Sequence, residues 1–229
     1  AAMLWEFESL FAHQSKMKLN SYNNLLELFF DQYKKQDKNN IFLINLGNPK
    51  HKLSWQKTYL LVNHLSNQIS KDIKLGDRCI LISENRPEWL ISDLAIMLAG
   101  GISVPSYTTY TTKDYEYIIK DCEPSVLIVS NNTQFNKIKD ILDYKKIKKI
   151  ISFDRLENLK FQNYLCIEDI INKKDGFENF DSEISLKRSD PACIIYTSGT
   201  QGNPKGVILS HGGILSNCEG GYELLKSII

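Results

Sequence analysis

A segment rich in glycine and hydroxyl side chains, with a single lysine, has the residue types needed to hold a polyphosphate. Apolar runs at 192–196 and 207–209 flank it, which predicts a strand, a loop and a second strand. Glycines let backbone N–H groups face a ligand, hydroxyls donate to phosphate oxygens or ligate Mg²⁺, and lysine adds a positive charge. The residues that we expect to contact phosphate are Thr197, Ser198, Gly199, Thr200, Gly202 and Lys205.

The segment does not match the other common motifs that bind phosphate or carry a serine nucleophile. The P-loop pattern G-x-x-x-x-G-K-[ST] and the dinucleotide pattern G-x-G-x-x-G are both absent. A hydrolase with Ser198 as nucleophile and His211 as base is disfavoured, because the G-x-S-x-G elbow is missing and no third group is indicated. A surface hairpin without a ligand is the remaining alternative. His211 follows Ser210, a plausible helix N-cap, so we predict that it opens the last helix.

Composition excludes several classes of protein. The net charge of +1 gives no electrostatic reason to expect nucleic acid as a partner. Five cysteines are scattered without a C-x-x-C pair, which is typical of reduced cysteines in a cytoplasmic protein. Four histidines show no metal-binding spacing. No apolar run reaches the ~20 residues of a membrane span, and the first residues lack a basic region typical of signal peptides.

The positions of apolar residues predict alternating strands and helices. Strands are expected at 41–46, 78–83, 102–105, 126–129 and 147–153, and helices at 24–36, 54–73, 85–99, 112–122 and 135–144. Ser54, Asn85 and Thr112 are the predicted helix caps, with Glu88 as the acid of a capping box. Short apolar strands that alternate with helices of crossover length predict an α/β fold, a mostly parallel sheet with helices on both faces.

Periodicity fades between 154 and 189, so we predict a subdomain boundary there. The expected division is an N-terminal tail at 1–20, a first α/β subdomain at 21–185, and at 186–229 the start of a second subdomain that carries the phosphate-binding loop. Trp89 and Tyr107 are candidates for an acyl pocket, although aromatic residues at helical spacing are more often part of a core.

The string Y-T-S-G-T-Q-G-N-P-K-G-V at 196–207 closely resembles the phosphate loop of the adenylate-forming synthetases, although Gln201 stands where that family usually has threonine. This family includes acyl-CoA synthetases, luciferases and nonribosomal-peptide adenylation domains. Three further segments are similar to long-chain fatty acyl-CoA synthetases: L-G-D-R-C-I-L-I-S-E-N-R-P-E-W at 75–89, A-G-G-I-S-V-P-S-Y-T-T-Y at 99–110 and D-C-E-P at 121–124. The resemblance runs from about Tyr22 to the last residue.

The resemblance implies an ATP-dependent, AMP-forming acid–thiol ligase. The carboxylate of a fatty acid would attack the α-phosphate of ATP, pyrophosphate would leave, and the acyl group would pass to the thiol of CoA. The loop residues above would bind pyrophosphate, Lys205 would act catalytically on the developing charge, and Thr197 or Ser198 would lie nearest Mg²⁺. Peripheral contact with a membrane is compatible with such a substrate.

The chain is much shorter than members of this family, so we interpret it as the partial N-terminal domain of such an enzyme and expect the fragment alone to be inactive. The family's residues for adenine, ribose, most of the acyl pocket and the C-terminal catalytic lysine would lie outside it. The alternatives are a non-catalytic nucleotide- or acyl-binding module, and an adenylating ligase for an aryl or amino acid.

Overall fold

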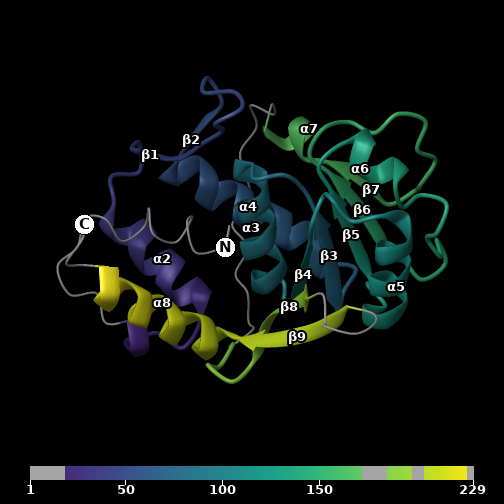
Figure 1. Ribbon diagram of the computed structural model, residues 1–229. Coiled ribbons are helices and arrows are strands. Elements are labelled where there is room, and N and C mark those ends of the chain that lie inside the picture. Colours follow the sequence, from purple (N-terminus) through teal and green to yellow (C-terminus); the bar gives the residue numbers. More distant parts are fainter. Residues whose placement is uncertain (1–18, 172–184, 198–203, 226–229) are drawn as a thin grey trace.

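The structure is a computed structural model that describes residues 19–171, 185–197 and 204–225 (Figure 1). Its centre is a seven-stranded sheet in the order β7-β6-β5-β3-β4-β8-β9. All neighbours pair in parallel except β8 and β9, which are antiparallel. The strands are β3 (Arg78–Ile82), β4 (Ile102–Ser106), β5 (Val126–Val129), β6 (Lys149–Ser152), β7 (Tyr164–Cys166), β8 (Pro191–Thr197) and β9 (Lys205–Ser210).

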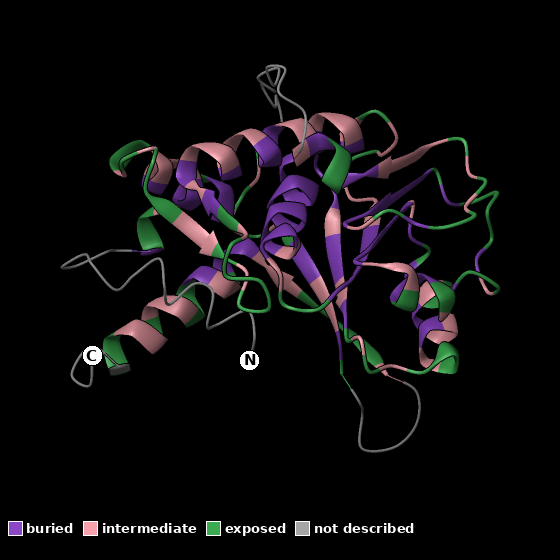
Figure 2. Cartoon of the chain, turned by 90° about the horizontal axis from the view of Figure 1, so that it is seen from above, coloured by how far each residue is buried: buried purple, intermediate pink, exposed green. Residues whose placement is uncertain are grey.

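Helices cover both faces of this sheet, as predicted. On β3, Cys79 and Leu81 pack in a cluster with α2 (Leu25–Lys35), α3 (Trp55–Ser70), α4 (Pro87–Leu98) and α8 (His211–Leu225). Ile80 and Ile82 point to the opposite face and pack with α5 (Thr112–Cys122) and α6 (Asn132–Asn136). Successive residues of a strand therefore point to opposite faces of the sheet. Because helices cover both faces, side chains that point either way are buried, which explains why these strands are apolar throughout. Figure 2 shows the resulting buried centre of strands and α4.

A separate two-stranded antiparallel sheet precedes the large one. It consists of β1 (Ile41–Ile44) and β2 (Lys52–Ser54), and the remaining elements are η1 (Leu19–Ser21) and α7 (Ile167–Ile171). The predicted strand at 41–46 is confirmed with an earlier end. The short β7 and α7 lie where no element was predicted, because three and five residues are too few to show a period.

Two of the three predicted caps differ from the structure. Ser54 caps α3 by accepting from the backbone N–H of Lys57 (3.2 Å), as predicted. Thr111, rather than Thr112, caps α5 in a reciprocal capping box with Asp114. The cap of α4 is Arg86, not Asn85, and its side chain makes no capping bond.

Glu88 is therefore not the acid of a capping box. It is 2% exposed and lies against the guanidinium of Arg86 (3.3 Å) and the ring of His51 (3.6 Å). With Arg86 at the N-cap, the third helical position is Trp89 and Glu88 is at the second, so Glu88 does not occupy the position that a capping box requires.

The predicted helix at 135–144 is wrong for most of its length. α6 starts earlier, after the capping side chain of Asn131, and ends at Asn136. Beyond it the backbone forms turns closed by bonds such as Ile141 N–H to the carbonyl of Ile138 (3.0 Å). Ile138 and Leu142 are nevertheless buried. Apolar residues four positions apart, which predicted a helix, are therefore buried here by turns instead.

Candidate functional site

The predicted strand–loop–strand unit is confirmed in its two strands. β8 and β9 pair over their whole length, and the last pair joins Thr197 to Lys205. Both of these residues are exposed, and directly opposite residues share a face of a strand pair. A hydroxyl and an ammonium group therefore stand together at the mouth of the loop. Of the predicted site residues, Ser198, Gly199, Thr200 and Gly202 lie outside the described residues, so their roles stay predictions.

The fold places this mouth at a position suited to ligand binding. β8 runs parallel to β4, so both strands end at the same edge of the sheet. In open α/β sheets, ligands bind outside the carboxyl ends of the strands. Thr197 is the last residue of β8, and it therefore lies at this edge.

Tyr196 anchors the end of β8 next to the loop. Its side chain is 3% exposed, and its hydroxyl donates to the carboxylate of Asp121 (2.5 Å). Its carbonyl oxygen accepts from the hydroxyl of Tyr110 (3.1 Å). Burial, with a contribution from Asp121, raises the pKa of the Tyr196 phenol. This neutral, doubly held tyrosine fixes the backbone from which Thr197 projects.

Tyr110 and Asp121 were not predicted as site residues. They are 86 and 75 residues from Tyr196 along the chain, and both lie in segments that resemble acyl-CoA synthetases. No local spacing signals such a long-range contact. The resemblance marks the segments, but it does not indicate which side chains meet.

Gly206 is needed for packing next to the loop. It pairs with Tyr196 across the two strands. A Cβ at this position would lie 3.0 Å from the Cγ2 of Ile194 and 3.2 Å from the ring of Tyr196. The absence of a side chain here therefore leaves room for the tyrosine ring that anchors the loop.

The ring of His211 is not available as a general base in this structure. As predicted, this residue opens α8, and the hydroxyl of Ser210 accepts from the backbone N–H of Gly213 (3.1 Å). Its ring is fully buried, and its Nδ1 accepts from the backbone N–H of Leu25 (3.4 Å). Burial lowers the pKa of the imidazole to about 4, so it is neutral at physiological pH.

The two aromatic candidates for an acyl pocket separate in the structure. Trp89 packs on the core cluster of the helices, which supports its interpretation as a core residue. Tyr107 is 60% exposed and its ring meets that of Tyr110 edge-on at 5.4 Å. Tyr107 therefore stands near the anchor of the loop, outside the core.

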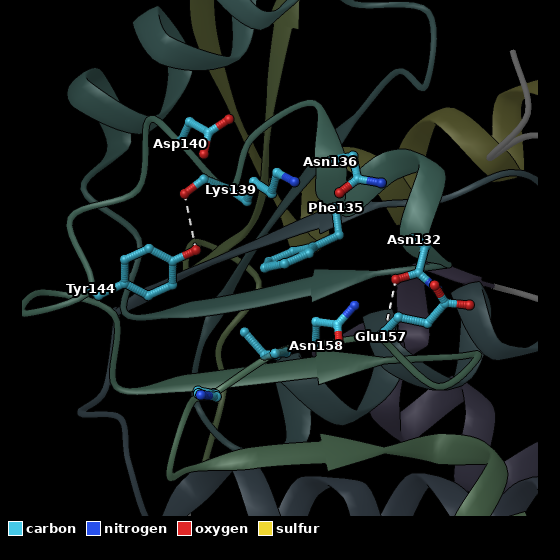
Figure 3. Close-up of a pocket in the computed structure, with 10 residues that line it drawn as sticks. Asn132, Phe135, Asn136, Lys139, Asp140, Tyr144, Glu157 and Asn158 are labelled. Atoms are coloured by element: carbon cyan, nitrogen blue, oxygen red, sulfur yellow. Dashed lines mark hydrogen bonds between the residues drawn. The ribbon is translucent and has the colours of Figure 1, made fainter.

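A cavity of about 570 Å³ lies elsewhere, between α6 and the segment after β6 (Figure 3). The ring of Phe135 lies at this cavity, where the Tyr144 hydroxyl donates to the Lys139 carbonyl (2.9 Å). Its lining mixes lysines with Asp140 and Glu157, so it favours neither charge. Three strands separate β6 from β8 in the sheet, and this cavity is therefore distinct from the loop.

Among the described residues, no group of three or more histidine, cysteine, aspartate or glutamate side chains could hold a metal ion. The predicted ligands of Mg²⁺ are hydroxyls instead. Thr197 is exposed at the mouth of the loop, and its hydroxyl is a hard oxygen ligand of the kind that Mg²⁺ accepts beside phosphate oxygens. Among the described residues this hydroxyl is the one predicted ligand, and its contact with Mg²⁺ stays a prediction.

Comparison with known proteins agrees with the fold. Residues 29–226 match the protein-family model described as AMP-binding enzyme. The chain is 29% identical over 201 residues to the long-chain-fatty-acid–CoA ligase ACSBG1 of Rattus norvegicus, covering 86% of this chain and 26% of that protein. It is 33% identical over 176 residues to ACSBG2 of Xenopus laevis, covering 73% of this chain and 23% of that ligase.

Solved structures share the same architecture. ATP-bound MatB from Rhodopseudomonas palustris superposes with a TM-score of 0.68 at 25% identity, over 88% of this chain and 38% of that one. The anthranilate CoA ligase AuaEII in complex with anthranoyl-AMP also gives 0.68, at 23% identity, over 85% of this chain and 36% of that one. The chain thus spans about a quarter of the length of the curated relatives.

Proposed function

The chain belongs to the AMP-binding enzyme family, and from this membership we propose that it supplies the phosphate-binding loop of an AMP-forming acyl-CoA ligase. The proposed substrates are a long-chain fatty acid, ATP and CoA. Relatives that are 29% and 33% identical are long-chain-fatty-acid–CoA ligases, which supports the choice of acid. The observation that carries the proposal is the exposed pair of Thr197 and Lys205 at the mouth of the loop.

The chemistry begins with a carboxylate that is too unreactive to acylate a thiol. Its oxygen attacks the α-phosphorus of ATP, and the bond from that phosphorus to the bridging oxygen of pyrophosphate breaks. The acyl-adenylate that results has a good leaving group, and the thiol of CoA displaces AMP from it. The barrier of the first step depends on stabilising the negative charge that accumulates on the departing pyrophosphate.

This chain's part in the mechanism is to receive that charge. The ammonium group of Lys205 and the hydroxyl of Thr197 face the same side of the strand pair. The anchor of Tyr196 holds the strand still, so the donors need little reorganisation during the reaction. Thr197 or Ser198 would hold Mg²⁺, which supplies neutralising positive charge to the phosphates when bound.

Lys205→Ala tests the catalytic role of this lysine in the full-length protein. We expect carboxylate-dependent ATP–pyrophosphate exchange to slow by about 10²–10³-fold, the scale for loss of one donor to a transition state. Lys205→Arg keeps the charge and should recover part of the rate, and Lys187→Ala removes another exposed lysine as a control. An exchange rate that Lys205→Ala leaves unchanged would refute the assignment.

The substrate is tested separately with a panel of carboxylates and hydroxylamine, which traps acyl-adenylates as hydroxamates. Long-chain fatty acids should give the highest rate, and a higher rate with an aryl or amino acid would replace the proposed substrate. Nucleotide binding by the full-length protein without any hydroxamate would favour the non-catalytic binding module.

We also propose a cytoplasmic location. Cys79, Cys122, Cys166 and Cys193 are buried and form no disulfide, as in proteins that fold in a reducing compartment. Fractionation of cells that express the tagged full-length protein tests this, and recovery from a secreted or periplasmic fraction would contradict it.

A further inference from the structure

The turn between β1 and β2 holds an apolar side chain in solvent on a rigid support. The backbone N–H of Asn45 donates to the carbonyl of His51 (3.0 Å), and that of His51 donates to the carbonyl of Asn48 (2.8 Å). These bonds close the tip of the hairpin. Leu46 stands on this closed tip and is 89% exposed. Figure 1 shows the hairpin projecting at the upper edge of the molecule, away from α5 and β9.

The hairpin is attached firmly to the body of the protein on its other side. Phe42 stacks on Trp55 of α3, with ring centroids 3.8 Å apart. His51 faces the buried carboxylate of Glu88 at the start of α4 (3.6 Å). The tip therefore has a fixed orientation relative to the sheet, and among the residues that the structure describes none covers Leu46.

The exposed side chains of the hairpin are apolar residues and lysines. Ile41 and Ile44 are 50% and 48% exposed, in addition to Leu46. Lys52 is the cross-strand partner of Ile44 and is exposed beside it, and Lys50 is exposed near the tip. Neither lysine makes an ion pair with a residue that the structure describes.

Charge is unevenly distributed along the sequence that contains this hairpin, although the chain as a whole is nearly neutral. Residues 38–71 contain no aspartate or glutamate, and they carry the lysines at 38, 50, 52, 57 and 71. The net charge of the whole chain is only +1, so acidic residues are concentrated elsewhere. A projecting apolar tip within a purely basic segment complements a surface that is apolar beneath a layer of negative charge.

We propose that the β1–β2 hairpin docks the protein on the surface of an anionic phospholipid bilayer. Leu46 and Ile44 enter the boundary between headgroups and acyl chains, and Lys50 and Lys52 bind lipid phosphates. Within the described residues, no helix is both long and apolar enough to cross a bilayer, and this docking needs none. The inference does not rest on the proposed ligase activity, because it concerns a different part of the surface.

Co-sedimentation of the full-length protein with vesicles tests the proposal without nucleotide. The vesicles contain phosphatidylcholine alone, or about three parts phosphatidylcholine to one part phosphatidylserine. The wild type should bind the anionic vesicles and should lose most of this binding at high salt. Leu46→Ser, and separately Lys50→Glu with Lys52→Glu, should each weaken binding by about tenfold or more.

Matched controls come from other parts of the surface. Leu75→Ser removes another leucine that is 72% exposed, and Lys139→Glu with Lys145→Glu reverses two other exposed lysines. Both controls should bind like the wild type, and all variants should keep the wild-type melting temperature. Three results would overturn the proposal: no binding of the wild type to anionic vesicles, equal losses in hairpin and control variants, or a wild-type dimer that Leu46→Ser dissociates.

Discussion

At the scale of single residues, burial decides the charge state of His211. The ring has no solvent contact, its Nδ1 accepts from a backbone N–H, and its Nε2 has no partner among the described residues. Burial lowers the pKa of the imidazole from 6.5 to about 4, because a charged ring would lose its hydration. The unfolded chain therefore takes up a proton at a higher pH than the folded protein does.

This difference predicts a loss of stability in acid. The His211 contribution should be fully present above pH 6.5 and should fall as the pH drops towards 4. Between pH 7 and pH 5, the loss in the free energy of unfolding should be about 2 kcal/mol. His211→Asn keeps an acceptor for the N–H of Leu25 but cannot be protonated, so its unfolding free energy should fall less over this range.

Urea unfolding of both proteins at several pH values measures the effect. The comparison is made between wild type and variant because other groups titrate in the same range. Burial raises the pKa of Asp93 to about 6, which favours the folded state in acid and opposes the effect of His211. Identical pH dependence in wild type and His211→Asn would contradict the assignment.

At the scale of one element, the start of α5 depends on one hydroxyl. The Oγ1 of Thr111 accepts from the backbone N–H of Asp114 (3.3 Å), and the carboxylate of Asp114 accepts in return from the N–H of Thr111 (2.9 Å). Thr111→Ala should lower the free energy of unfolding by about 1 kcal/mol, the usual cost of losing a capping side chain.

Thr111→Ser is the matched control, since serine keeps the capping oxygen and should retain most of the stability. The neighbouring Thr112 donates to the carbonyl of Lys137 (3.0 Å) and does not cap the helix. Denaturant unfolding of the two variants at position 111 distinguishes the cases, and equal stability of the alanine and serine variants would show that this cap has no energetic role.

At the scale of the whole molecule, Arg86 and Glu88 join three units of the fold. The guanidinium of Arg86 makes two bonds to the carboxylate of Asp154 after β6 (2.9 and 2.8 Å) and also meets Glu88 of α4 (3.3 Å). Glu88 in turn faces His51 of the β1–β2 hairpin (3.6 Å). Arg86 and Glu88 together thus connect the segment after β6, the buried helix α4 and the hairpin.

Substitutions of Arg86 and of Asp154 should lower the free energy of unfolding by different amounts. Arg86→Met leaves the carboxylate of Glu88 buried without its main cation, and it should lower the free energy of unfolding by about 3 kcal/mol. Asp154 has a side chain that is 48% exposed, so Asp154→Asn should cost less than about 1 kcal/mol. Urea unfolding measures both, and a larger loss for Asp154→Asn than for Arg86→Met would show that Glu88 does not need Arg86.

Most of the α/β fold followed from local patterns. Apolar runs predicted the strands of the large sheet from β3 to β6, the two strands around the loop, and helices α2, α3, α4 and α5. Errors occurred where local signals are short or ambiguous, as at α6, β7 and α7. The division into subdomains near residue 186 stays a prediction.

The family, the kind of sheet and the chemical composition of the loop could be predicted from local sequence, because they depend on residues that are neighbours in the chain. The contacts of Tyr110 and Asp121 with Tyr196, the space that Gly206 leaves for its ring, and the burial of His211 became visible with the folded structure alone. Parallel strands need long crossovers. Side chains that meet at one edge of such a sheet are therefore separated by dozens of residues, and no spacing in the sequence records their contact.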